Sequence, residues 1–132
     1  MIDRRTMLKA AGAGLAMIPT VSISFAATSA PFSRSAFAEA QKANRPILIE
    51  VHASWCPTCR AQAPIISELI AQPQYKNLAV FRVDFDGQRD DVRALGAQAQ
   101  STLIVFKGAT EVGRSVGDTR RDSIAALLGK SV

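Results

Sequence analysis

Two cysteines, Cys56 and Cys59, are separated by two residues. They follow a short apolar run and precede a helix-forming stretch, so Cys56 is expected at the start of a helix. One helical turn then brings the two sulfurs to bonding distance, and the free N–H groups and positive dipole end of the helix stabilise a thiolate. The spacing predicts a reversible dithiol–disulfide cycle. Cys56, with a lowered pKa, would be the nucleophile, and a less exposed Cys59 would resolve the mixed disulfide.

The residues around the pair fit this chemistry. Pro57 suits the first turn of a helix, where its missing N–H is not needed. Thr58 adds a hydroxyl but no charge, so it stabilises a thiolate less than a histidine would. Trp55 is expected as a partly exposed flank that helps to bind extended polypeptide.

An alternation of helices and strands must position these residues. Hydrophobic patterning and breaker residues predict helices at 33–43, from Cys56 to 71 with a kink at Pro64, at 89–95, and after a cap at Asp118 or Thr119. They predict strands at 47–52, 78–84, 102–106 and 111–116, with a loop at 72–77. This order indicates an α/β three-layer sandwich, a small mixed sheet flanked by helices.

Length and composition limit the alternatives. The 132 residues, 48% of them hydrophobic and 20% charged, suit one folded domain. The net charge is +5, but no basic run exceeds two residues, so nucleic acid is not an expected partner. Two cysteines are too few for a disulfide-rich scaffold or a four-thiolate zinc site. We expect a monomer.

The N-terminus has the pattern of an export signal. Arg4 and Arg5 precede a weakly hydrophobic stretch at 10–27 that ends in small residues. The pair resembles a twin-arginine signal. We expect a signal peptide at 1–26, cleaved after Ala26, and a periplasmic mature protein; an uncleaved membrane anchor is the alternative. A lead-in with the first helix would follow at 27–45, and the main domain at 46–130.

From residue 47 to about 128, the chain resembles thioredoxin-fold thiol–disulfide oxidoreductases. The specific part is the segment ASWCPTCR at 53–60. The likeness is strongest to exported members with a Trp-Cys-Pro-x-Cys motif, including those that reduce apocytochrome c thiols. The resemblance implies the thioredoxin-like sandwich, a redox-active Cys56–Cys59 disulfide and no other cofactor.

Two polar residues precede the motif, on the expected strand at 47–52. In the family, the position of Glu50 often holds a buried acid that exchanges a proton with the inner cysteine through water. Apolar neighbours should raise the pKa of Glu50 toward the range of a general base; a solvent-facing carboxylate or one paired with Arg82 is the alternative. His52, the only histidine, replaces a family aromatic residue, either as a packing substitute or as a group that tunes Cys56.

Ser101 departs from the family, which has a cis-proline immediately before the strand that starts at Thr102. A cis bond before serine costs about 3 kcal/mol, so a trans bond is expected. In the family, substrate peptide pairs with this loop, so Ser101 and Thr102 are candidate substrate-binding residues together with Trp55, Pro57 and Thr58. Loss of the proline also opens room for a metal ligand.

These features support three hypotheses. The first is an enzyme that reduces disulfides in exported proteins, with Cys56, Cys59 and Glu50 as catalytic residues and a membrane protein as electron donor. The second is a copper or zinc module using Cys56, Cys59 and His52, which would need a fourth ligand from elsewhere. The third is an interaction domain in which the cysteines are only a structural staple.

Overall fold

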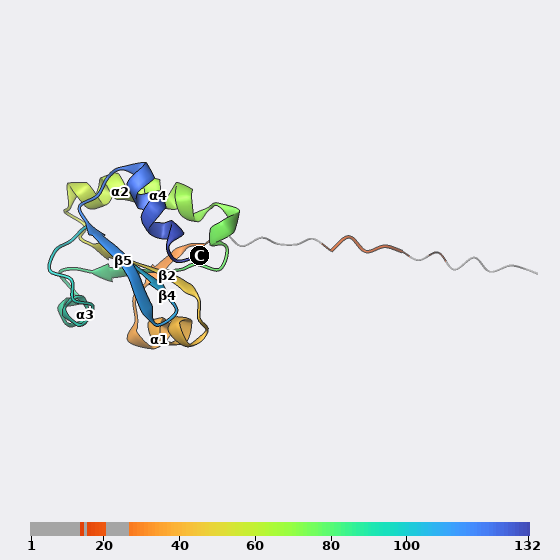
Figure 1. Ribbon diagram of the computed structural model, residues 1–132, viewed down its shortest axis with the longest axis horizontal. Coiled ribbons are helices and arrows are strands. Elements are labelled where there is room, and N and C mark those ends of the chain that lie inside the picture. Colours follow the sequence, from red (N-terminus) through yellow and green to blue (C-terminus); the bar gives the residue numbers. More distant parts are fainter. Residues whose placement is uncertain (1–13, 15, 21–26) are drawn as a thin grey trace, which may run out of the picture.

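The computed structural model describes residues 14, 16–20 and 27–132 (Figure 1). The expected signal cleavage site and the paired arginines lie outside the described residues. Among the helices that are described, none has the length and hydropathy needed to cross a bilayer.

The chain forms a mixed five-stranded sheet between two layers of helices. In chain order, the elements are β1 (Ser29–Pro31), α1 (Arg34–Lys42), β2 (Pro46–His52), α2 (Pro57–Ile70), a 3₁₀ turn (Pro73–Tyr75), β3 (Ala79–Asp84), α3 (Arg89–Ala94), β4 (Thr102–Lys107), β5 (Thr110–Val116) and α4 (Arg121–Gly129). The strand order is β1-β3-β2-β4-β5. β1 and β2 run parallel to β3, whereas β4 is antiparallel to both β2 and β5. This confirms the expected α/β sandwich.

β2 lies at the centre of the sheet because its sequence can be buried on both faces. Ile47, Ile49 and Val51 pack into the apolar cluster beneath α1 and α3, and Leu48 packs into the cluster beneath α2 and α4. The two helix pairs lie on opposite sides of the sheet in Figure 1. The continuous apolar run therefore reports a strand covered on both faces, and it fixes the point at which the chain leaves the sheet toward the cysteines.

Three local expectations need correction. β1 was not expected; its three residues have no strand pattern and are held by parallel pairing with Val80, Phe81 and Arg82. The segment expected as a loop at 72–77 contains the 3₁₀ turn. The last helix has Arg120 at its N-cap, with no side-chain cap, because the Asp118 carboxylate instead accepts the Arg120 N–H at 3.0 Å in a local turn.

Candidate active site

Cys56 is the N-cap residue of α2, as the spacing predicted. Its backbone is extended (φ −83°, ψ 113°), and its sulfur accepts a hydrogen bond from the Cys59 N–H at 3.2 Å. Pro57 occupies the first helical turn. The helix continues through Pro64 to Ile70, so that proline does not end it.

The Cys56 thiol has a lowered pKa, and the contributions to it oppose one another. Burial raises the pKa of Cys56, whereas hydrogen bonds from the Cys59 and Ser101 side chains and from the N–H groups of Cys59 and Thr58 lower it. The hydrogen bonds prevail, so the pKa lies below the ordinary value for cysteine. The N-cap position thus provides the activation that a nucleophilic thiol needs.

Both cysteines are free thiols and both are covered. Cys56 is 2% exposed and Cys59 3%, so the expectation that Cys59 would be the less exposed of the two is wrong. The two residues pack with Ala53 and Phe85. Both cysteine side chains are therefore largely covered by neighbouring residues.

Ser101 lies directly against both sulfurs. Its Oγ is 3.1 Å from the Cys56 Sγ and 3.2 Å from the Cys59 Sγ. The residue is 3% exposed and its φ is 63°, in the left-handed region that non-glycine residues rarely occupy. The peptide bond before it is trans, as expected. The adjacent Thr102 is buried, and its hydroxyl donates to the Ala99 carbonyl at 2.7 Å.

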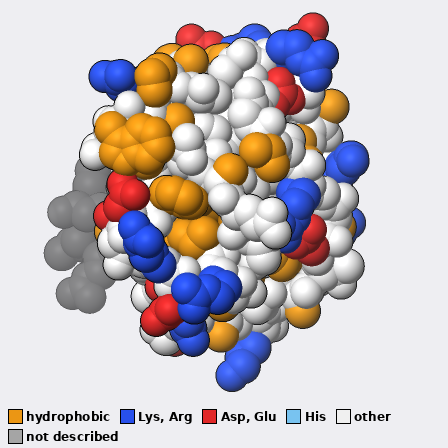
Figure 2. All heavy atoms as spheres, turned by 90° about the vertical axis from the view of Figure 1, so that its left-hand side faces the viewer, with side chains coloured by type: hydrophobic (Ala, Val, Ile, Leu, Met, Phe, Trp, Pro, Cys, Tyr) orange, Lys and Arg blue, Asp and Glu red, His pale blue; other side chains and the backbone are white. Residues whose placement is uncertain are grey.

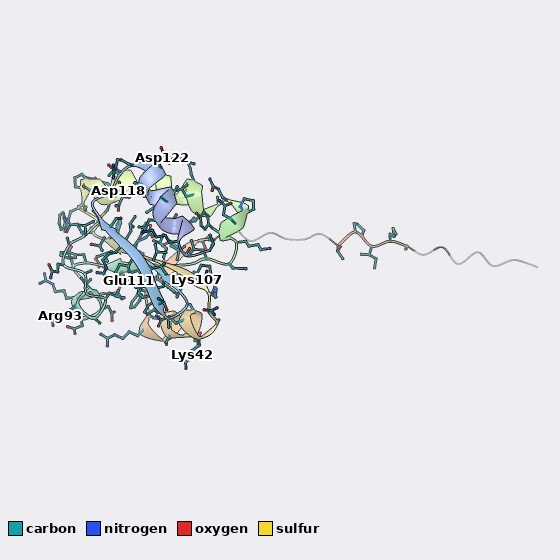
Figure 3. All side chains as sticks on the ribbon, in the orientation of Figure 1. Lys42, Arg93, Lys107, Glu111, Asp118 and Asp122 are labelled. Atoms are coloured by element: carbon teal, nitrogen blue, oxygen red, sulfur yellow. The ribbon has the colours of Figure 1, made fainter. Side chains whose placement is uncertain are left out.

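Sequence reasoning missed the residue that holds this loop. Gln62, which is buried on α2, donates from Nε2 to the carbonyls of Ser101 (3.2 Å) and Asp118 (2.8 Å), and so ties together the loops before and after the β4–β5 hairpin. Asp118, in the second of these loops, is labelled in Figure 3. The Ser101 N–H donates to the Val51 carbonyl at 2.8 Å. A glutamine one turn after Cys59 among apolar residues was the available signal.

Trp55 is 54% exposed beside the helix start. Its indole N–H donates to the Asp86 carboxylate at 2.6 Å, a contact that the sequence did not indicate. Pro57 is exposed and Thr58 is half-buried. Figure 2 shows apolar side chains grouped between charged ones on one face of the molecule. A flat aromatic side chain fixed by one hydrogen bond suits contact with an extended peptide.

Glu50 is buried on β2, at 5% exposed. Burial raises the pKa of its carboxyl, and the charge of Arg82 and a hydrogen bond from Ser29 lower it by less, so the net direction is upward. The Ser29 hydroxyl donates at 3.0 Å, and the Arg82 Nε lies 3.6 Å away. Glu50 is thus both buried and paired. No direct hydrogen bond joins it to either sulfur in the described part of the chain, and its role in proton transfer stays a proposal.

His52 is half-buried at the end of β2, in register with Asp84. Burial lowers its pKa, the Arg82 charge lowers it further, and Asp84 opposes both. Within residues 14, 16–20 and 27–132, no group of three His, Cys, Asp or Glu side chains could hold a metal ion. His52 therefore does not complete a metal site with the two cysteines.

Comparison with known proteins agrees with this site. The family model for thioredoxin matches residues 28–130. The chain is 32% identical to a thioredoxin of Chlamydia muridarum over 84 residues, covering 64% of this chain and 80% of that one. It is 35% identical over 94 residues to a bifunctional thioredoxin reductase/thioredoxin of Mycobacterium leprae, covering 71% of this chain but 20% of that protein.

A solved structure gives the same result. The crystal structure of Trxlp from Edwardsiella tarda superposes with a TM-score of 0.75 at 38% identity, and the match covers 76% of this chain and 98% of that one. The family model, the fold and the lowered pKa of the Cys56 thiol at the start of α2 therefore all indicate the same kind of protein. The chain belongs to the thioredoxin family and is a thiol–disulfide oxidoreductase.

Proposed function

We propose that this oxidoreductase works in the cell envelope, where it reduces disulfides in exported proteins. The observation that carries the location is the N-terminal sequence, in which Arg4 and Arg5 precede a weakly hydrophobic stretch and small residues. The envelope is an oxidising compartment, so a reductase there needs a supply of electrons. We propose that a membrane protein passes cytosolic electrons to this enzyme. The name of the Mycobacterium leprae relative joins thioredoxin to a thioredoxin reductase, and the membrane protein would take the role of that reductase.

The reaction has two steps. The Cys56 thiolate attacks a substrate disulfide, forms a mixed disulfide and releases the first substrate sulfur as a thiolate. Cys59, after loss of its proton, then attacks the Cys56 sulfur. The bond between Cys56 and the second substrate sulfur breaks, and that sulfur leaves with the electron pair. The substrate gains two electrons, and the enzyme is left with the Cys56–Cys59 disulfide.

Glu50 is the base that we propose for the second step. The pKa of Glu50 is raised and so lies closer to physiological pH than that of an exposed glutamate, which suits a group that exchanges protons at that pH. A cavity of about 320 Å³ beside Glu50 is also lined by Ala63, Ile66 and Ser67 of α2. Water in this space could connect the carboxyl with the helix that carries Cys59.

Location is tested by expressing the full chain in a bacterial host and separating periplasm from cytosol. We expect a periplasmic protein whose first residue is Ala27. The double variant Arg4→Lys, Arg5→Lys should remain in the cytosol as the full-length precursor, because it keeps the charge but loses the arginine pair. An uncleaved protein held at the membrane by residues 1–26 would show that the segment is an anchor and not a cleaved signal. Wild-type protein found in the cytosol would refute export.

The direction of electron flow is tested by equilibrating the Cys56–Cys59 pair with glutathione buffers. We expect a potential below about −150 mV, toward the value of about −270 mV typical of thioredoxin, because no charged residue lies between the cysteines. A potential above about −150 mV would make the enzyme an oxidant while leaving its dithiol chemistry intact.

A further inference from the structure

The position of Ser101 carries an inference beyond the family reaction. A proline there would have no hydroxyl, whereas the serine hydroxyl lies within 3.2 Å of both reacting sulfurs and is closed off from solvent. A hydroxyl has one proton to donate and two lone pairs to accept. It can therefore serve two sulfurs at once, accepting from a thiol while it donates to a thiolate.

In one arrangement the Ser101 hydroxyl joins both sulfurs when Cys56 is ionised. The Cys59 thiol then donates to the Ser101 Oγ, and the Ser101 hydroxyl donates to the Cys56 thiolate. The Val51 carbonyl, 4.0 Å from the Cys59 sulfur, is the other acceptor that the Cys59 thiol can reach. We propose that the Ser101 hydroxyl is a catalytic group of this enzyme, which stabilises whichever cysteine is the thiolate and passes the proton between the two sulfurs. The proposal rests on the dithiol site and is independent of the location and direction proposed above.

The proton balance is simple. If Cys59 gives its proton to Ser101 while Ser101 gives its own to Cys56, the charge moves from the Cys56 sulfur to the Cys59 sulfur and no electron is transferred. Once Cys56 is in a mixed disulfide, its sulfur carries no charge. The hydroxyl is then free to donate to the Cys59 thiolate, the nucleophile of the second step. One serine thus supports both nucleophiles in turn.

The surrounding contacts hold the hydroxyl in place. The Ser101 N–H donates to Val51, and its carbonyl accepts from Gln62 and from the Gly117 N–H at 3.0 Å. These bonds fix the backbone at a positive φ, a conformation that strains a residue with a Cβ. A residue needed only to fill space here would be glycine, which has no such strain.

The test compares Ser101→Ala, which removes the hydroxyl but keeps the Cβ, with Ser101→Gly, which removes both and suits the backbone. The readout is the apparent pKa of the Cys56 thiol, from thiolate absorbance and from the pH profile of alkylation. We expect both variants to raise this pKa by about one unit, which means about tenfold less thiolate at neutral pH. Ser101→Thr, which keeps a hydroxyl, should restore much of the effect if it folds.

Ser131→Ala is the matched control, because the Ser131 hydroxyl is also buried and donates to a carbonyl, that of Leu128, away from the site. It should leave the pKa of Cys56 unchanged. An unchanged pKa in both Ser101 variants would refute the proposal. A rise in the alanine variant alone would also refute it, because both variants lack the hydroxyl.

Discussion

Replacing Cys59 with serine is expected to leave the enzyme covalently bound to its substrates. Cys56 keeps its position at the start of α2 and its Ser101 contact, so it still attacks disulfides, but no second thiol can release the product. Turnover in a coupled insulin-reduction assay should fall by about a thousandfold or more, as is usual when a covalent intermediate cannot be resolved. Non-reducing gels should show mixed disulfides that disappear with dithiothreitol.

Cys56→Ser is the matched control. It should lose turnover to the same extent without forming any adduct, because the remaining Cys59 lies inside the first helical turn and not at the N-cap position that activates the Cys56 thiol. Adducts formed through Cys59 in this variant would reverse the assignment of the two roles. Insulin reduction by the wild type but not by this variant would dismiss the hypothesis that the cysteines only staple the fold.

The dithiol could be predicted from the sequence because its geometry is local. Two intervening residues and a helix start determine where the Cys56 sulfur lies relative to the Cys59 N–H, whatever the rest of the chain does. The central strand could be predicted equally well, because a strand buried on both faces is apolar throughout and shows no alternation of apolar and polar residues. These features depend on neighbours in sequence, and they fixed the family resemblance.

Other parts of the site depend on residues far apart in the chain. Gln62 meets Ser101 and Asp118 only after the sheet has brought their loops to α2, and Ser29 reaches Glu50 only because β1 pairs with β3. No spacing rule predicts such contacts. The covered state of Cys56 has the same origin, because Phe85 and Ser101 approach it from other segments.

This cover affects how the pKa of Cys56 should be interpreted. A thiol that is covered yet has a lowered pKa depends on its hydrogen bonds, since burial alone would raise the pKa. Access and activation are therefore linked. A substrate that reaches the Cys56 sulfur also meets the contacts that lower its pKa, the one with Ser101 among them.

Glu50→Gln is expected to stabilise the fold while slowing catalysis. The folded pKa of Glu50 is raised above its unfolded value, so its contribution to stability is complete below the unfolded pKa and is lost as pH rises through the folded pKa. Glutamine never ionises. The glutamine variant should therefore gain free energy of unfolding over the wild type as pH rises from the unfolded to the folded pKa of Glu50. The gain should reach about 1.36 kcal/mol for each unit by which that pKa is raised. The Arg82 side chain is 40% exposed and so stays partly hydrated without the carboxylate, although its Nε is buried without a hydrogen-bond partner.

The kinetic half of this prediction separates a base from a structural acid. If Glu50 takes the proton of Cys59, release of the mixed disulfide should slow by about a hundredfold at neutral pH, the lower range for a lost general base, while the first attack by Cys56 is unchanged. Rapid-quench measurements of the two steps distinguish these outcomes. A more stable variant with both steps intact would make Glu50 a buried partner of Arg82 and Ser29 only, and the proton of Cys59 would need another acceptor.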